Sequence, residues 1–266
     1  MALWHLIILA LIQGVTEFLP VSSSGHLILL PALTGMDDQG LFLDVALHIG
    51  TLGAVILYFR TDVARALAGI AGLLRRRWGP DERLALGLAI ATVPVAVAGL
   101  AIKLTIGTDA LRSVAVIGWA MLGFGLLLWW FDRHGPQTKT AADWTPGQAF
   151  RLGLWQAVAL IPGTSRSGIC ITGARAMGYE RHDAARLAML MSIPTILASG
   201  TLLMIDAAGA TDAAVLRDAG LAALLSFGAA LAALALMMRL LRSVSFTPYV
   251  IYRVALGILL LGWAYL

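Results

Sequence analysis

The sequence predicts an all-α integral membrane protein in which six transmembrane helices and two re-entrant helix-tip-helix segments form an inverted-topology repeat. Three observations carry this prediction. Only 13% of the 266 residues are charged and the mean hydropathy is +0.85, whereas about 25% of the residues of a soluble domain are charged. Six segments are apolar over the length of a membrane span, and two others are apolar at both ends but interrupted by Pro, Gly and Ser.

The six uninterrupted segments can each cross a bilayer, since a helix needs about 20 apolar residues to span a hydrocarbon core of about 30 Å. They cover residues 41–59, 84–103, 112–131, 187–205, 215–238 and 248–266. Residues 60–83 are rich in charge and are expected to form a loop.

The interrupted segments cover residues 3–33 and 150–177, and their breaks read EFLPVSSSGH and IPGTSRSG. Pro, Gly and Ser at such a break end one helix before the next begins. We therefore expect each segment to form two half-helices joined by a non-helical tip. Such a tip is tolerated at membrane depth only where it is buried in protein or lines a polar cavity.

The two interrupted segments also align with each other at an offset of 143 residues, which superposes Ser22, Ser24 and Gly25 on Ser165, Ser167 and Gly168. Three spans follow each segment, and three crossings reverse the direction of the chain, so the second unit must be inverted. This predicts one membrane domain, residues 1–266. Repeat 1 covers about 1–131, repeat 2 about 150–266, and a cytoplasmic connector about 132–149.

The basic residues predict the orientation, because cytoplasmic loops are enriched in Lys and Arg. All but four of the 19 lie in or beside the loops 60–83, 132–149, 178–186 and 239–247; the exceptions are Lys103, Arg112, Arg166 and Arg217. Both termini are then expected on the outer, periplasmic side, with the two tips near the midplane. The net charge of +4 does not indicate a nucleic-acid partner, because the basic residues flank apolar segments.

Several charged residues fall inside the apolar segments, where each costs roughly 2.5 to 3.5 kcal/mol unless it finds a partner or water. Glu17, Asp44 and Arg166 are in this position. Gln13 precedes Glu17 by four residues, and Asp44 precedes His48 by four, so each pair shares one helix face.

The two tips are expected to bind an anion. Ser22 to Ser24 would begin one half-helix and Thr164 to Ser167 another, and unpaired N–H groups at a helix start attract negative charge. Arg166 adds a planar guanidinium that matches the geometry of phosphate. A phosphate-bearing ligand is the natural inference.

A metal and an acid–base pair are expected beside the phosphate. Glu17 would repel a phosphate unless a divalent cation, Mg²⁺ or Ca²⁺, lay between them. His26 can act as a general acid or base near neutral pH, and a serine beside it is a candidate nucleophile. These residues predict hydrolysis of a phosphoanhydride in an amphiphilic substrate.

The motifs QGVTEFLPVSSSGH and PGTSRSG, with the spans around them, resemble the undecaprenyl-pyrophosphate phosphatase family, also called bacitracin-resistance proteins, over essentially the whole chain. The resemblance implies a multi-pass phosphatase of the bacterial inner membrane. It would convert undecaprenyl diphosphate to undecaprenyl phosphate, recycle this carrier for peptidoglycan synthesis, need a divalent cation and open to the periplasm.

By motif position, the resemblance implies that Glu17 is the catalytic or metal-associated acid, Ser23 the nucleophile, His26 its acid–base partner and Arg166 the diphosphate clamp. Further phosphate contacts are expected from Ser22, Ser24, Gly163, Thr164, Ser165, Ser167 and Gly168. Gln13 is a second candidate metal ligand, and Asp44, His48 and Gln156 are candidates for supporting positions around the site.

The chain departs from the family pattern at two positions. Gln13 replaces a glutamate found in many members, which removes one carboxylate from the site, and Cys170 replaces the threonine that ends the second motif. Thr172 could supply the missing hydroxyl contact. Activity is expected to be retained.

Other interpretations remain open. Glu17 and Arg166 could form a structural ion pair, the serines could serve close helix packing, and Asp44 and His48 could hydrogen-bond between helices. Inverted repeats with broken helices are also typical of transporters, so the alternative function is an isoprenyl-phosphate flippase. The sequence is also compatible with a homodimer. The tryptophans, Trp144 among them, are expected in interfacial belts.

Overall fold

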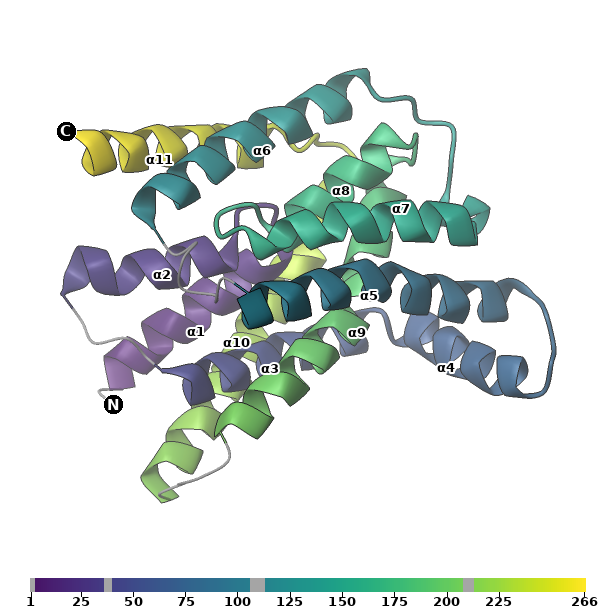
Figure 1. Cartoon of the computed structure of the whole chain (residues 1–266), viewed down its shortest axis with the longest axis horizontal. Helices are drawn as coiled ribbons and strands as arrows, with labels where there is room; N and C mark the ends of the chain where they lie inside the picture. Colours follow the sequence, from purple (N-terminus) through teal and green to yellow (C-terminus); the bar gives the residue numbers. More distant parts are fainter. Residues whose placement is uncertain (1–2, 36–39, 106–112, 208–212) are drawn as a thin grey trace.

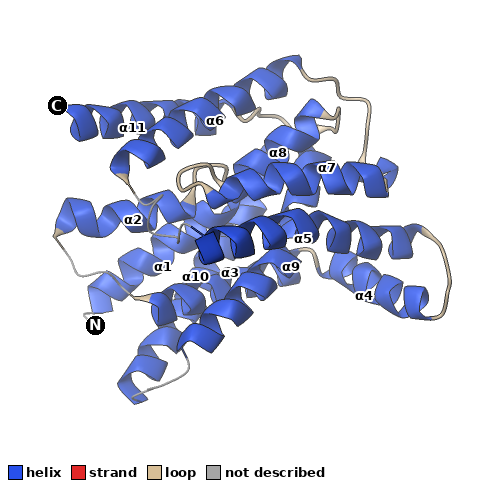
Figure 2. Cartoon of the chain, in the orientation of Figure 1, coloured by secondary structure: helices blue, strands red, loops and turns tan. Residues whose placement is uncertain are grey.

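The computed structural model describes residues 3–35, 40–105, 113–207 and 213–266, and every named element within these ranges is a helix (Figure 2). The chain is a multi-pass helical bundle. Both termini lie at one end of it, and the turn between α4 and α5 lies at the other (Figure 1).

Among the described residues, five helices are long and apolar enough to cross a membrane. They are α5 (Pro80–Thr105), α6 (Val114–His134), α9 (Arg181–Ala207), α10 (Ala213–Leu240) and α11 (Thr247–Tyr265). A sixth candidate is α3 (Leu41–Tyr58), which passes the same test only together with the helix that follows it. Each of the six predicted spans coincides with one of these helices, except for the end positions 59, 113 and 266, which are not helical; position 112 lies outside the described residues.

The expectation of a loop at 60–83 was wrong. Residues Arg60–Leu74 form α4, which departs from α3 at an angle of 89°. Its 15 residues are too few to span a membrane. Val63, Leu67 and Ile70 form an apolar face at helical spacing, but the charged residues of the first turn led to the prediction of a loop.

Both interrupted segments consist of two helices, as their Pro and Ser residues predicted. The first contains α1 (Leu3–Phe18) and α2 (Ser23–Thr34). The second contains α7 (Pro146–Ala157), a 3₁₀ turn η3 (Val158–Leu160) and α8 (Arg166–Ala176). The non-helical residues between the members of each pair form the tips.

Small residues bring α1 and α3 close to α10. A Cβ atom at Gly14 of α1 would lie 2.6 Å from Cβ of Ala229, and one at Gly50 of α3 would overlap the carbonyl oxygen of Ala223. Small residues commonly permit such close approach between membrane helices. This packing fixes the position of α1, which ends at the first tip.

A polar cluster closes the end of the bundle opposite the termini. Arg175 is fully buried at the end of α8 and donates to the carbonyl oxygens of Asp132 (3.0 Å) and Tyr179. The Asp132 carboxylate accepts from Arg181 at 2.7 Å and from the backbone N–H of Phe246 at 3.2 Å. These bonds tie the ends of α6 and α8 to the starts of α9 and α11. The short helix η2 (Ala141–Asp143) lies at the same end.

Candidate active site

The first tip turns sharply at Ser22. This residue has a φ of 74°, in the left-handed region that side chains rarely adopt. Its hydroxyl accepts a hydrogen bond from the backbone N–H of Gly25 at 3.3 Å and so caps α2. Ser23 and Ser24 then form the first turn of that helix.

The second tip repeats this geometry. Ser165 has a φ of 69°, and its hydroxyl accepts from the N–H of Gly168 at 3.1 Å. Within each tip the capping serine also lies near a second serine: Ser165 Oγ is 3.1 Å from Ser167 Oγ, and Ser22 Oγ is 3.4 Å from Ser24 Oγ. The equivalent residues are those that the offset of 143 aligned in sequence.

Arg253 of α11 connects the two tips. Its side chain is fully buried and donates to the carbonyl oxygen of Pro20 in the first tip at 3.4 Å. It also donates to the carbonyl oxygens of Thr164 (2.8 Å) and Gly163 (3.3 Å) in the second tip, and to that of Ala120 in α6 at 3.3 Å. One guanidinium therefore satisfies backbone carbonyls from both broken segments.

A polar cluster forms where the tips meet. Glu17 Oε1 accepts from Arg166 Nη2 at 2.8 Å, and Glu17 Oε2 accepts from Ser23 Oγ at 2.6 Å. Gln13 Nε2 donates to the same Oε2 at 3.0 Å. The structure thus brings the predicted acid, nucleophile and clamp into direct contact, across 149 positions of sequence in the case of Arg166.

Three buried polar atoms near this cluster have no hydrogen-bond partner among the described residues: Arg166 Nη1, Gln13 Oε1 and Thr164 Oγ1. A buried donor or acceptor without a partner is unfavourable. Arg166 Nη1 and Thr164 Oγ1 could donate hydrogen bonds to a phosphate. Gln13 Oε1, together with the Glu17 carboxylate, could bind a cation associated with that phosphate.

The cluster faces a cavity of about 300 Å³. Its polar lining includes ten side chains: Glu17, Ser22, Ser23, Ser24, His48, Gln156, Ser165, Arg166, Thr195 and Ser199. The remaining residues that line it, such as Val95 and Leu160, are apolar. A cavity with a polar end and apolar walls between membrane helices suits an amphiphile.

The structure separates the two histidines that the sequence placed at the site. His48 lines the cavity, and its Nε2 lies 3.8 Å from Glu17 Oε2, beyond hydrogen-bond distance. His26 is absent from the residues that line the cavity. Its Nδ1 lies 2.6 Å from the Ser22 carbonyl oxygen and its Nε2 lies 2.5 Å from the Tyr252 hydroxyl. In the described part of the chain no hydrogen bond joins His26 to Ser23, although both belong to the first two turns of α2.

The other predicted residues lie around the tips. Gln156 is buried, and its amide nitrogen donates to the Ala91 carbonyl oxygen at 3.4 Å. Its amide oxygen accepts a hydrogen bond from the Cys170 thiol at 3.8 Å. Asp44 accepts a bond from His48 Nδ1 through its backbone carbonyl at 2.7 Å.

The remaining predicted phosphate contacts bind within the protein. Ser167 donates to the Leu19 carbonyl oxygen at 3.0 Å, a second link between the tips. Gly163 has a φ of 88° and lies against the backbone of Ile117, where a side chain would not fit. Thr172 is buried and donates to the Gly168 carbonyl oxygen at 2.7 Å, so its hydroxyl is used within α8.

The oxygen ligands at the site are few. Among the described residues, no group of three or more His, Cys, Asp and Glu side chains could hold an ion alone. Glu17 and the unpartnered Gln13 Oε1 supply one carboxylate and one amide oxygen. Mg²⁺ is commonly held by one or two carboxylates together with substrate phosphates and water. The residues present fit a cation that shares its ligands with a substrate.

Residues 6–259 match the family described as bacitracin resistance protein BacA. The chain belongs to that family. It is 66% identical over 266 residues to an undecaprenyl-diphosphatase of Ruegeria pomeroyi, and 65% identical over 266 residues to one of Dinoroseobacter shibae, with both chains fully covered in each case. It is also 45% identical to undecaprenyl-diphosphatase 1 of Rhodospirillum rubrum, covering all of this chain and 96% of the relative.

Four residues near the site of this BacA family member were not singled out from the sequence: Arg253, Tyr252, Thr195 and Ser199. Arg253 lies within the apolar segment 248–266, and a charge in such a segment indicates a buried partner. The positive-inside prediction instead assigned it to the basic residues that flank loops. Tyr252, Thr195 and Ser199 carry no comparable signal, because hydroxyl groups are common in membrane helices.

Proposed function

We propose that the protein is an integral membrane phosphatase that hydrolyses undecaprenyl diphosphate to undecaprenyl phosphate and inorganic phosphate. This activity would recycle the lipid carrier for peptidoglycan synthesis and confer resistance to bacitracin. The names of full-length relatives at 60% identity or more support the proposal. The structural observation that carries it is the contact of Glu17 with both Ser23 and Arg166 at one cavity.

Glu17 is placed to accept a proton. Ser23 Oγ lies 2.6 Å from Glu17 Oε2, so the carboxylate can take the hydroxyl proton as Ser23, or a water that it orients, attacks the terminal phosphorus. The bond from that phosphorus to the bridging oxygen then breaks, and the prenyl monophosphate leaves. Attack by water releases inorganic phosphate directly, whereas attack by Ser23 leaves a phosphoserine that a water molecule hydrolyses in a second step. Arg166 stabilises the negative charge of the terminal phosphate through Nη1, which has no protein partner among the described residues.

The two tips complete the phosphate site in this proposal. The starts of α2 and α8 line the cavity through Ser23, Ser24 and Arg166, next to the capping residues Ser22 and Ser165. Helix starts attract anions. A divalent cation held by Glu17 and Gln13 would neutralise phosphate charge at the point where Glu17 otherwise repels it.

We assign His26 the role of acid–base residue and His48 a supporting role. His26 is held by two short hydrogen bonds, and its Nε2 is reached only by a group that displaces the Tyr252 hydroxyl. His48 is half-buried and too far from Glu17 for a hydrogen bond, so it makes no direct proton transfer to that carboxylate.

We further propose that the protein lies in the bacterial inner membrane with its termini and the cavity mouth on the periplasmic side. In this arrangement α1 and α2 enter from outside, α7 and α8 enter from the cytoplasm, and the two halves form an inverted repeat. The matching caps at Ser22 and Ser165 support the repeat. A homodimer would use the apolar outer surface of the bundle.

The test is phosphate release from a long-chain prenyl diphosphate by the purified protein, with and without a chelator. Glu17→Gln, His26→Ala and Arg166→Ala are each expected to lower kcat by about 10² or more. His134→Ala and Arg151→Ala change exposed residues of the same types outside the cavity and are expected to leave kcat unchanged. Chelation is expected to abolish release, and Mg²⁺ or Ca²⁺ to restore it.

Unchanged release in the three site variants, with folding confirmed by thermal unfolding, would remove the catalytic assignment. If the parent releases no phosphate but binds the lipid, and binding is lost only in Arg166→Ala, the alternative of an isoprenyl-phosphate flippase is favoured.

A further inference from the structure

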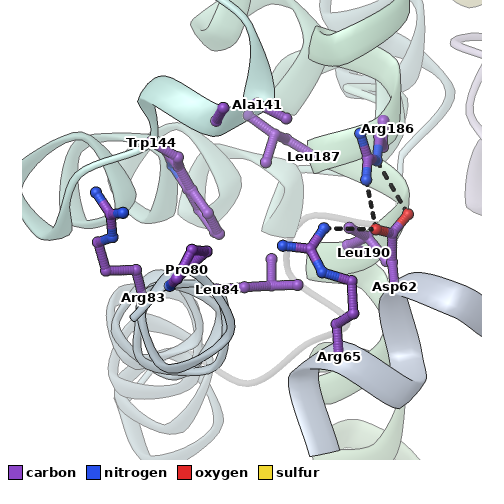
Figure 3. Close-up of a pocket in the computed structure, with 11 residues that line it drawn as sticks. Asp62, Arg65, Pro80, Arg83, Leu84, Ala141, Trp144, Arg186, Leu187 and Leu190 are labelled. Atoms are coloured by element: carbon purple, nitrogen blue, oxygen red, sulfur yellow. Dashed lines mark hydrogen bonds and ion pairs between the residues drawn. The ribbon is translucent and has the colours of Figure 1, made fainter. Parts of the chain in front are cut away.

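A second polar cavity (Figure 3) is lined by residues from α4 and α5, whose connecting turn lies at the end of the bundle opposite the termini (Figure 1). It has a volume of about 210 Å³ and is lined by residues from the first three turns of α4, α5 and α9 and from η2 with the residue after it. Its lining includes Asp62, Arg65, Arg83, Trp144 and Arg186. None of these residues lines the cavity at Glu17.

On one side of this cavity both arginines are paired with carboxylates. The Asp62 carboxylate is buried and accepts two hydrogen bonds from Arg186, and Arg65 Nη1 lies 3.6 Å from it. Arg65 also donates to Asp81 at 2.8 Å, and Arg186 lies 3.8 Å from Asp183. Two arginines are thus matched by three carboxylates, and Figure 3 shows the Asp62, Arg65 and Arg186 group on one wall.

The opposite wall carries unused donors. Figure 3 shows Arg83 and Trp144 there, and the Arg83 guanidinium makes no hydrogen bond or ion pair with any residue that the structure describes. Trp144 is only 5% exposed, not interfacial as the sequence suggested, and its Nε1 has no acceptor in the described part of the chain. A buried N–H without an acceptor is unfavourable, so this wall lacks an anionic or carbonyl partner.

An apolar groove adjoins the cavity. It runs between α4, α5 and α9, has a volume of about 320 Å³, and is lined entirely by apolar side chains. Leu190 lines both spaces. Leu67 and Leu197 on its rim are 61% and 51% exposed, so the groove opens on the outer surface of the bundle, where a membrane protein meets hydrocarbon.

We propose that the cavity and the groove together form a binding site for an anionic phospholipid. The phosphodiester would accept from Arg83 and from Trp144 Nε1, and an acyl chain would occupy the groove. One unpaired arginine matches the single negative charge of a phosphodiester, whereas a phosphate monoester carries up to two charges at neutral pH. Bound in this way, the lipid holds α4, which departs from α3 at 89°, against α5 and α9.

The proposed lipid site does not depend on the proposed phosphatase activity, because its cavity shares no lining residue with the cavity at Glu17. The test is therefore a binding measurement by native mass spectrometry. The full-length protein is titrated with phosphatidylglycerol, phosphatidylcholine or a prenyl monophosphate, each over the same range of concentrations. Phosphatidylglycerol is expected to bind about tenfold tighter than phosphatidylcholine, the ratio typical of one charge-assisted contact.

Two substitutions locate the site. Arg83→Gln and Trp144→Phe are each expected to weaken phosphatidylglycerol binding by about threefold to tenfold. The first removes the positive charge and the second the N–H donor, and both keep most of the side-chain volume. Arg242→Gln changes an exposed arginine elsewhere in the described chain and is the matched control. Ala66→Phe places a ring in the groove and is expected to weaken both phospholipids.

Equal binding of the two phospholipids, or equal effects of Arg83→Gln and Arg242→Gln, would overturn the proposal. Displacement of phosphatidylglycerol by a lower concentration of the prenyl monophosphate would also overturn it, in favour of the product lipid as the occupant. Arg83 is exposed, so its replacement tests the site even if Trp144→Phe unfolds the protein.

Discussion

Arg253 is the residue on which the relative position of the two tips depends. Arg253→Met removes the donor to four backbone carbonyls, in Pro20, Ala120, Gly163 and Thr164. Each unpaired buried acceptor costs about 1 to 3 kcal/mol, so we expect a lower unfolding temperature in detergent and a loss of phosphate release of at least about tenfold. Arg253→Lys, which keeps the charge, should recover part of the thermal stability. Parent-like unfolding of Arg253→Met would contradict this role.

Tyr252 distinguishes two roles of His26. Tyr252→Phe removes the hydrogen bond to His26 Nε2 and keeps the stacked ring, whose centroid lies 5.7 Å from that of the imidazole. If Nε2 transfers a proton to or from the substrate, the variant should keep at least about a tenth of the parent kcat, while His26→Ala loses about 10² or more. Steady-state phosphate release measures both. Equal losses would show that His26 acts by anchoring the first tip to α11.

Single residues also show what sequence can and cannot predict about a site. Glu17 and Arg166 were recognisable because a charge inside an apolar segment requires a partner, and the structure pairs them at 2.8 Å. The sequence could not predict that His48 lines the cavity while His26 lies against Tyr252. Both histidines lie one helical turn from a polar residue of the site, and only the tertiary packing decides which of them faces the cavity. The proposed roles of Ser23 and His26 stay predictions.

At the scale of helices, the close packing of α1 on α10 positions Gln13 and Glu17. Gly14→Ala places a Cβ 2.6 Å from Cβ of Ala229 and 2.7 Å from the backbone oxygen of Ser226. Overpacking of this kind costs about 1 to 3 kcal/mol, so the unfolding temperature and phosphate release should both fall. The control is Gly228→Ala in α10, where a Cβ meets open space and should raise helix stability by up to about 1 kcal/mol. Equal unfolding temperatures for the two variants would refute the packing argument.

The broken helices were predictable from local chemistry, and α4 was not. Pro20 and Pro162 with the serines after them indicated both breaks, and the structure ends α1 at Phe18 and starts α8 at Arg166. Helix α4 has 15 residues and a charged first turn, so a search for spans of about 20 apolar residues passes over it. Its packing against the start of α5, where Gly69 meets the Asp81 backbone, depends on contacts that no local pattern reveals.

At the scale of the whole molecule, the apolar content and the spacing of the segments were sufficient to predict a helical membrane protein. Hydropathy works here because a helix satisfies all of its own backbone groups in lipid. Composition and periodicity do not predict the angle of 89° between α3 and α4 or the hydrogen bonds of Arg253 to both tips. Both features depend on contacts between residues that are far apart in the sequence.

The proposed orientation makes opposite predictions for the two ends of the bundle. Cys170 is the only cysteine and is buried, so Cys170→Ser gives a background in which a single introduced cysteine can be labelled. Arg77→Cys lies in the turn between α4 and α5, at the end rich in arginine, and Leu266→Cys lies at the exposed C-terminus. The positive-inside rule places the first in the cytoplasm and the second outside.

A membrane-impermeant maleimide added to intact spheroplasts should therefore label Leu266→Cys at once and Arg77→Cys only after lysis. Both variants should label equally in detergent, which controls for the intrinsic reactivity of the two thiols. The reversed pattern would place the turn between α4 and α5 outside the cell. Helix α1 begins and α11 ends at the end of the bundle that carries the termini (Figure 1). The proposed orientation puts the mouth of the cavity at Glu17 on that same side, so the reversed pattern would contradict hydrolysis at the outer face.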